Sequence, residues 1–173
     1  SPSTLNLGAS VTVTLTLSGS CPIGPSMADV MLVADPRIVF GYTYELARGQ
    51  EALEQLVLAL DPPTYRVGAA TVMTGTKQVE IIAPLGSGQP LLLQALRGLG
   101  RRYDYATMVG PDAVWPDLVR TAADHLAAEG RGGVARVILF VGGILPRSSL
   151  SSAADFVAGG GIIKAVQLPH AHA

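Results

Sequence analysis

One carboxylate, Asp35, is the residue in this sequence best placed to do chemistry. It ends the segment ADVMLVAD of residues 28–35, in which four large hydrophobic residues follow one another. Such a run is typical of a strand that is buried on both faces of a parallel sheet. Ligands of open α/β sheets bind beyond the carboxyl ends of the strands, so we expect Asp35 at the ligand-binding edge. A carboxylate there is suited to holding a hard cation such as Mg²⁺.

The residues after Asp35 do not complete a cation site. Residues 35–39 read DPRIV, and the guanidinium of Arg37 repels a cation and cannot ligate it. Asp35 is therefore either the last remnant of a metal site or the partner of Arg37 in a salt bridge. The sequence also has no nucleophile elbow, no phosphate loop with its lysine and no supported cysteine–histidine pairing. We expect no catalytic residues, no cofactor and no enzymatic activity.

A second candidate surface is aromatic. Tyrosine and tryptophan bury a large area with little entropy loss and keep a polar tip, which favours them at interfaces with proteins and sugars. Six of the nine aromatic residues fall near the predicted ligand-binding edge, either as an interaction surface or as packing beneath the loops: Phe40, Tyr42, Tyr44, Tyr103, Tyr105 and Trp115.

The composition excludes two classes of partner. A net charge of −1 with 14% charged residues gives no electrostatic basis for binding nucleic acid or an anionic membrane surface. No apolar run reaches the roughly 18 to 20 residues that cross a bilayer. With 49% hydrophobic residues and a mean hydropathy of +0.39, the chain carries a surplus of apolar surface that packing between subunits would cover.

The positioning elements follow from hydrophobic periodicity. We expect helices over residues 45–60, 89–99, 112–129 and 148–157, and strands over residues 28–35, 65–73, 77–84, 136–141 and 162–168. The strands at 65–73 and 77–84 are expected to form a hairpin. Alternation of strands and helices predicts a mostly parallel, doubly wound α/β sheet with helices on both faces.

An extra strand precedes this pattern. Residues 5–18 place apolar Val11, Val13, Leu15 and Leu17 on one side and hydroxyl side chains on the other. A Gly/Pro linker follows it and contains Cys21, the only cysteine. We therefore expect an N-terminal strand and linker over residues 1–25 and an α/β domain over residues 26–173.

Together these residues resemble a von Willebrand factor type A domain of the bacterial secreted or surface type. ADVMLVAD is similar to the first strand and first metal-site aspartate of that family, YRVGAATVM to its second strand, and VARVILFVGG to the strand that normally ends in Thr-Asp-Gly. The resemblance implies a metal-ion-dependent adhesion site, D-x-S-x-S, completed by a later threonine and aspartate. Here both serines are replaced, the aspartate falls at Gly142, and Thr107 is a candidate for the threonine.

The resemblance therefore implies a degenerate site without metal. It also implies a last strand and closing helix, which we expect this domain to lack, leaving a sheet edge open to strand addition. Our main hypothesis is a non-enzymatic, extracellular interaction module that self-associates as a homo-oligomer or filament. The strand at residues 11–17 would complete a sheet within its own subunit or in a neighbour. The alternative is a surface adhesin that binds a host protein or glycan through the aromatic loops.

Overall fold

The central strand of the computed structural model is the apolar run that ends before Asp35. The structure describes residues 27–34, 43–73, 78–102, 114–142 and 150–167. Every residue of β1 is buried, as expected for a strand flanked by two others and covered on both faces. The strands are β1 (Ala28–Ala34), β2 (Tyr65–Val72), β3 (Val79–Ala83), β4 (Ala135–Gly142) and β5 (Ile162–Gln167).

These strands form one sheet in the order β3-β2-β1-β4-β5. The pairs of β1 with β2, β1 with β4 and β4 with β5 are parallel, and β3 pairs antiparallel with β2. The predicted mostly parallel sheet and its hairpin are thus confirmed. The expected strand at residues 11–17 lies outside the described residues.

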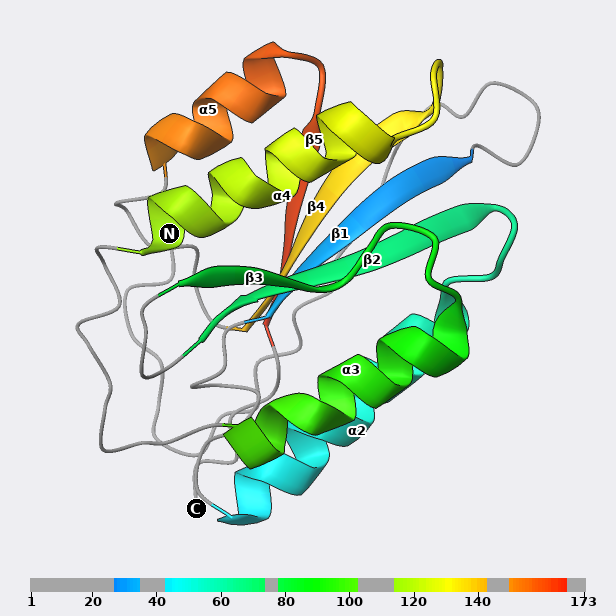
Figure 1. Cartoon of the computed structure of the whole chain (residues 1–173), viewed down its shortest axis with the longest axis vertical. Helices are drawn as coiled ribbons and strands as arrows, with labels where there is room; N and C mark the ends of the chain where they lie inside the picture. The colour runs from blue at the N-terminus through cyan, green and yellow to red at the C-terminus, as the bar shows by residue number, and fades with distance from the viewer. Residues whose placement is uncertain (1–26, 35–42, 74–77, 103–113, 143–149, 168–173) are drawn as a thin grey trace, which may run out of the picture.

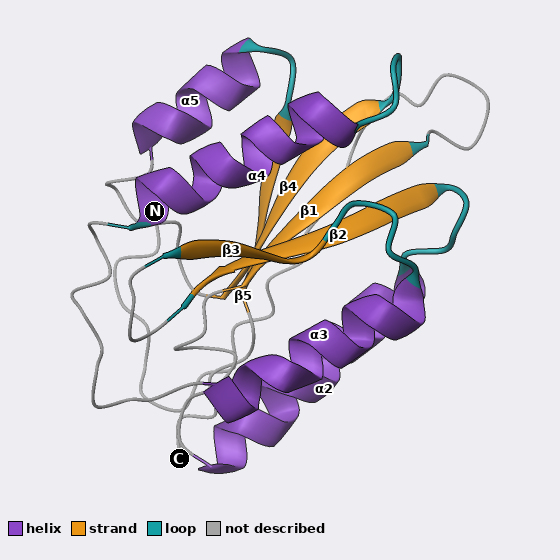
Figure 2. Cartoon of the chain, in the orientation of Figure 1, coloured by secondary structure: helices purple, strands orange, loops and turns teal. Residues whose placement is uncertain are grey.

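Within the described ranges, four helices cover the two faces of the sheet, as the periodicity predicts. On one face lie α2 (Thr43–Ala59) and α3 (Gln89–Arg102), and on the other lie α4 (Trp115–Glu129) and α5 (Leu150–Ala158) (Figure 1). Figure 2 shows the two helical layers on opposite sides of the fanned sheet. Within the part of the chain that the structure describes, no helix is both long and apolar enough to cross a membrane.

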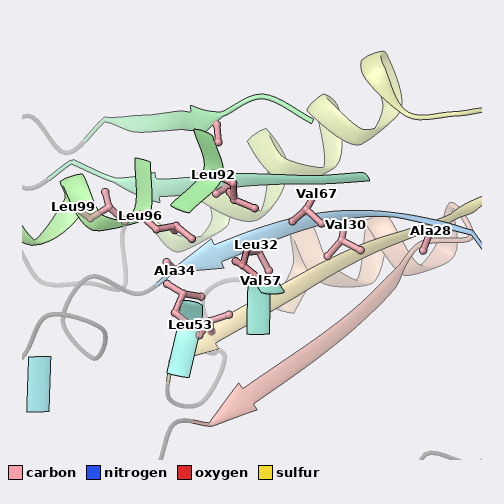
Figure 3. Packing of buried hydrophobic residues seen from close by; sticks show 13 residues of the cluster. Ala28, Val30, Leu32, Ala34, Leu53, Val57, Val67, Leu92, Leu96 and Leu99 are labelled. Atoms are coloured by element: carbon pink, nitrogen blue, oxygen red, sulfur yellow. The ribbon is translucent and has the colours of Figure 1, made fainter. Parts of the chain in front are cut away.

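Two apolar cores result from the alternation of side chains along β1. Val30, Leu32 and Ala34 belong to the cluster that α2 and α3 cover, with Leu53 and Leu96 among the helical contributors (Figure 3). The intervening residues of β1 belong to the cluster that α4 covers. Because both faces of β1 are filled, its position relative to the helices is fixed, and so is the point at which the chain leaves it toward Asp35.

Candidate functional site

The carboxyl end of β1 is the position at which the sequence predicts a site. The register pairs Ala34 with Val141, and both side chains are fully buried. Asp35 therefore directly follows one member of this pair, and Gly142 directly follows the other. The neighbouring strands thus lead to the two positions that the resemblance assigns to metal-site aspartates, and one of them holds glycine.

Most of the predicted site residues belong to segments beyond the described ranges. Asp35, Tyr42, Tyr103, Tyr105 and Thr107 lie outside the described residues. Tyr44 is in the first turn of α2, in a stretch whose side chains are not described. Elsewhere in the described ranges, no group of three or more His, Cys, Asp or Glu side chains is arranged to hold a metal ion.

A buried hydroxyl fixes the end of β1 beside this edge. Thr71 Oγ1 on β2 donates a hydrogen bond to the carbonyl oxygen of Ala34 at 3.1 Å, and Thr71 is fully buried. A buried carbonyl needs such a donor, because water does not reach it. The bond holds the last residue before Asp35 against the neighbouring strand.

Replacing Thr71 with valine tests that anchor. The Thr71→Val chain keeps the side-chain shape but leaves the Ala34 carbonyl without its hydroxyl donor, so we expect the free energy of unfolding to fall by about 1 kcal/mol. Urea denaturation measures this loss, provided that the dependence of the unfolding free energy on urea concentration is the same in both chains. Thr71→Ser, which keeps the hydroxyl, should lose less; an equal loss in both variants would argue against the hydrogen bond as the cause.

Trp115 is a core residue, which corrects the expectation that it belongs to an interaction surface. Its side chain is only 2% exposed, at the start of α4. The indole meets the ring of Phe140 edge-on, with ring centroids 5.4 Å apart and an interplanar angle of 72°. The physical reason is the first turn of α4, which turns this position toward the sheet rather than toward solvent.

At the amino end of the sheet, the structure reveals a polar cluster that sequence reasoning missed. Asp29 in β1 is fully buried, and its two carboxylate oxygens accept hydrogen bonds from the backbone N–H of Arg131 at 2.5 Å and from Arg131 Nε at 2.8 Å. The remaining donors of the same guanidinium reach Met27 Sδ and three backbone carbonyl oxygens, those of Ala28, Pro63 and Thr64. One arginine therefore ties the α2–β2 and α4–β4 connections to the start of β1.

Arg66 is a second guanidinium in this cluster. Its Nη1 lies 4.0 Å from Asp29 Oδ2 and donates to the carbonyl of Glu129 at 3.2 Å, while its Nη2 donates to the carbonyl of Leu85 at 3.3 Å. Two cations thus share one carboxylate. The signal for this cluster was present in the sequence: Asp29 is the only charged residue of the buried strand, and a buried charge requires a partner.

Two further polar side chains connect elements near this end. Gln89 Nε2 donates to the carbonyls of Val57, near the end of α2, and of Leu60, just beyond it, both at 3.2 Å. The Val57 carbonyl also accepts a hydrogen bond from the backbone N–H of Leu60. His125 on α4 accepts a hydrogen bond from the backbone N–H of Leu85 at 3.1 Å through Nε2. The bonds of Gln89 join the start of α3 to the end of α2, and the bond of His125 joins the β3–α3 connection to α4.

The strand order and the two helical layers define the architecture as a von Willebrand factor type A-like α/β fold. No protein-family model matches the sequence, and none of the curated proteins matches it.

Solved structures match the fold. The chain is similar to the TRAP protein of Plasmodium vivax in a manganese-loaded crystal structure, with a TM-score of 0.62, 14% identity, and coverage of 84% of this chain and 59% of that one. It is similar to BatB from Bacteroides thetaiotaomicron, with a TM-score of 0.57, 14% identity, and coverage of 80% and 65%. It is also similar to an aerotolerance-related membrane protein from Bacteroides fragilis, with a TM-score of 0.56, 12% identity, and coverage of 85% of this chain and 74% of that one. The chain thus spans less than two thirds of the first two, and at such identities the likeness shows the fold alone.

Proposed function

We propose that this chain is a non-enzymatic, extracellular protein-interaction module that acts through metal-independent contacts and self-associates into a surface assembly or filament. In this proposal, the alternating residues Val11, Val13, Leu15 and Leu17 form a strand that adds to the β5 edge of a neighbouring copy. The observation that carries the proposal is the difference between the two edge strands of the sheet.

The β3 edge has several features that discourage pairing with another chain. The strand is five residues long, carries the charge of Glu80, and is followed directly by Pro84, and its pairing with β2 is irregular between Ala69 and Ala70. Short length, charge, proline and bulges are the features by which edge strands avoid unwanted pairing.

The β5 edge has fewer of these features. Its six residues, IIKAVQ, include one charge, Lys164, and no proline. Among the described residues, no strand pairs with its outer side. Ile162 is 41% exposed there, and Lys164 and Ala165 are also exposed. An exposed apolar edge strand of this kind is a template for strand addition.

Burial on the face of α2 and α3 decreases toward β5. Val30 on β1, Val137 on β4 and Ile162 on β5 are register partners on that face. Val30 is buried, Val137 is half-buried and Ile162 is exposed. A strand with one apolar and one hydroxyl-rich side would cover Ile162 with its apolar side and turn its hydroxyls to solvent. The N-terminal segment has that composition.

Metal independence is supported by the residues at the carboxyl edge. Arg37 brings a positive charge two residues after Asp35, and Gly142 contributes no oxygen ligand from its side chain. A single carboxylate offers Mg²⁺ little to replace its bound water. The adhesin alternative finds no support in the described residues, because Trp115 lies in the core.

Light scattering of the full chain beside a chain without residues 1–20 tests the proposal. We expect oligomers from the full chain, monomers after truncation, and no effect of adding Mg²⁺ or EDTA. Ile162→Lys should also weaken association, because it places a charge on the edge. Leu150→Lys is the matched control, since Leu150 is an apolar residue that is 54% exposed and belongs to α5, not to the edge strand. A monomeric full chain, or equal association after truncation, would overturn the proposal.

A further inference from the structure

A pocket lies beside the buried Asp29 cluster, and one positive charge in its lining, that of Arg66, is not neutralised by the carboxylate of Asp29. Its volume is about 310 Å³, and residues of the α2–β2, β3–α3 and α4–β4 connections line it. Its walls are mainly apolar and include Pro62, Pro63 and Leu92. Its charged residues are Arg66 and Arg131, and none of the described residues that line it is acidic.

The two arginines differ in how many of their N–H groups remain available to a ligand. Arg131 has all five N–H groups directed at Asp29, at Met27 Sδ or at backbone carbonyls. Its charge is matched by Asp29, at 2.8 Å. Arg66 makes two hydrogen bonds to carbonyls of the described residues, so three of its five N–H groups stay available. One net positive charge therefore remains in the cluster, on the arginine with free donors.

The backbone holds Arg66 at the pocket. Gly86 lines the pocket with φ of +82°, and a Cβ built on it would lie 2.9 Å from Arg66 Nε. Glycine suits the left-handed conformation, and its lack of a Cβ leaves room for the guanidinium close to the backbone. The Arg66 side chain is 32% exposed, so a ligand can reach it without any rearrangement of the sheet.

We propose that this pocket binds the carboxylate of a small ligand that carries a short apolar group. A planar guanidinium with free N–H groups matches a carboxylate through two parallel hydrogen bonds. The prolines and Leu92 supply contact for an apolar body of a few carbon atoms, which the volume can hold. The carboxylate belongs either to an aliphatic acid or to the C-terminal residue of a peptide. This site is independent of strand addition at β5.

Titrations of the full chain followed by ¹H–¹⁵N NMR test the site with three probes: hexanoate, N-acetylleucine and N-acetylleucine amide. We expect saturable shifts around Arg66 with at least one of the two acids and none with the uncharged amide. Binding of N-acetylleucine alone would identify a peptide terminus, binding of hexanoate alone an aliphatic acid, and binding of both the shared chemistry. No binding of either acid, or equal binding of the amide, would overturn the proposal.

Variants of Arg66 distinguish a role of its guanidinium in ligand binding from a role in folding. Arg66→Gln should weaken binding of the acid by about tenfold or more, because it removes the charge and the paired donors. Arg66→Lys keeps the charge and loses the planar fork, so it should weaken binding less and serves if the glutamine variant does not fold. Arg120→Gln, on the exposed face of α4, is the control and should bind as the original chain does. Unchanged affinity in both Arg66 variants would also overturn the proposal.

Discussion

An Asp29→Ala chain should lose about 3 kcal/mol or more of unfolding free energy, which makes it one of the most damaging single substitutions available. The carboxylate is fully buried and is the only ion-pair partner of Arg131 that the structure describes. Its removal leaves a guanidinium and a backbone N–H without their acceptor. Since Arg131 is 25% exposed, water can reach part of it, and we place the effect at the lower end of the range for broken buried pairs.

Chemical denaturation monitored by circular dichroism measures this loss. Asp117→Ala is the matched control, because Asp117 also pairs with an arginine, Arg120, at 3.1 Å, but both side chains are exposed. Removal of that carboxylate should change stability by less than about 0.5 kcal/mol. Similar losses in the two variants would mean that burial of Asp29 does not determine its contribution.

Truncation of Trp115 to alanine should cost about 3 to 5 kcal/mol, the usual cost of removing a large aromatic side chain from a core. The indole contacts Phe140 and lies over the sheet beneath the first turn of α4. Trp115→Phe keeps an aromatic ring in contact with Phe140 and should cost markedly less. Equilibrium unfolding in guanidinium chloride provides both values.

This experiment also separates the two possible roles of the tryptophan. A residue of an exposed recognition surface would lose partner binding on truncation and keep its stability. A core residue loses stability in both variants, in proportion to the volume removed. A Trp115→Ala chain with unchanged stability would contradict the core position.

Much of the fold follows from the sequence because each element has a local pattern. The buried run that forms β1, the two weakly charged segments on either side of a Thr-Gly-Thr sequence that become β2 and β3, and the 3.6-residue periodicity of α4 each predict their own structure. Predicted and observed boundaries agree within three residues, and the parallel order follows from the alternation of strands and helices. Hydrophobic patterns are therefore enough to predict the sheet and the two helical layers that cover it.

The polar cluster at the amino end has no such local pattern. Asp29 and Arg131 are 102 residues apart, and Arg131 stands in a glycine-rich connection that looks like an ordinary surface loop. Gln89 and His125 likewise act on carbonyl or N–H groups of other elements. The pairing of β1 with β4 brings Asp29 and Arg131 together, and the packing of the helices brings Gln89 and His125 to their partners. Such pairwise contacts leave no periodic pattern in one sequence.

Trp115 is a residue for which the sequence predicts a surface role, whereas the structure places it in the core. Its position near the start of a helix and its residue type both indicate a surface loop, because aromatic residues are frequent at interfaces. The helix begins at this residue, which places the indole on the same side as Leu118, Val119 and Ala122. An aromatic residue at the first turn of an amphipathic helix is therefore better assigned by the helical face than by its residue type.

The central position of β1 has a mechanical consequence for the proposed assembly. The N-terminal segment is joined to β1 through the Gly/Pro linker, and the neighbour's segment would pair with β5. Tension along a chain of such subunits would pass from β5 through β4 to β1, across two parallel pairs. Force applied along the strands loads their hydrogen bonds together in shear rather than one after another. The helices would carry little of this load, and the bonds of Arg131 to Ala28 and Asp29 would reinforce the point where it enters the sheet.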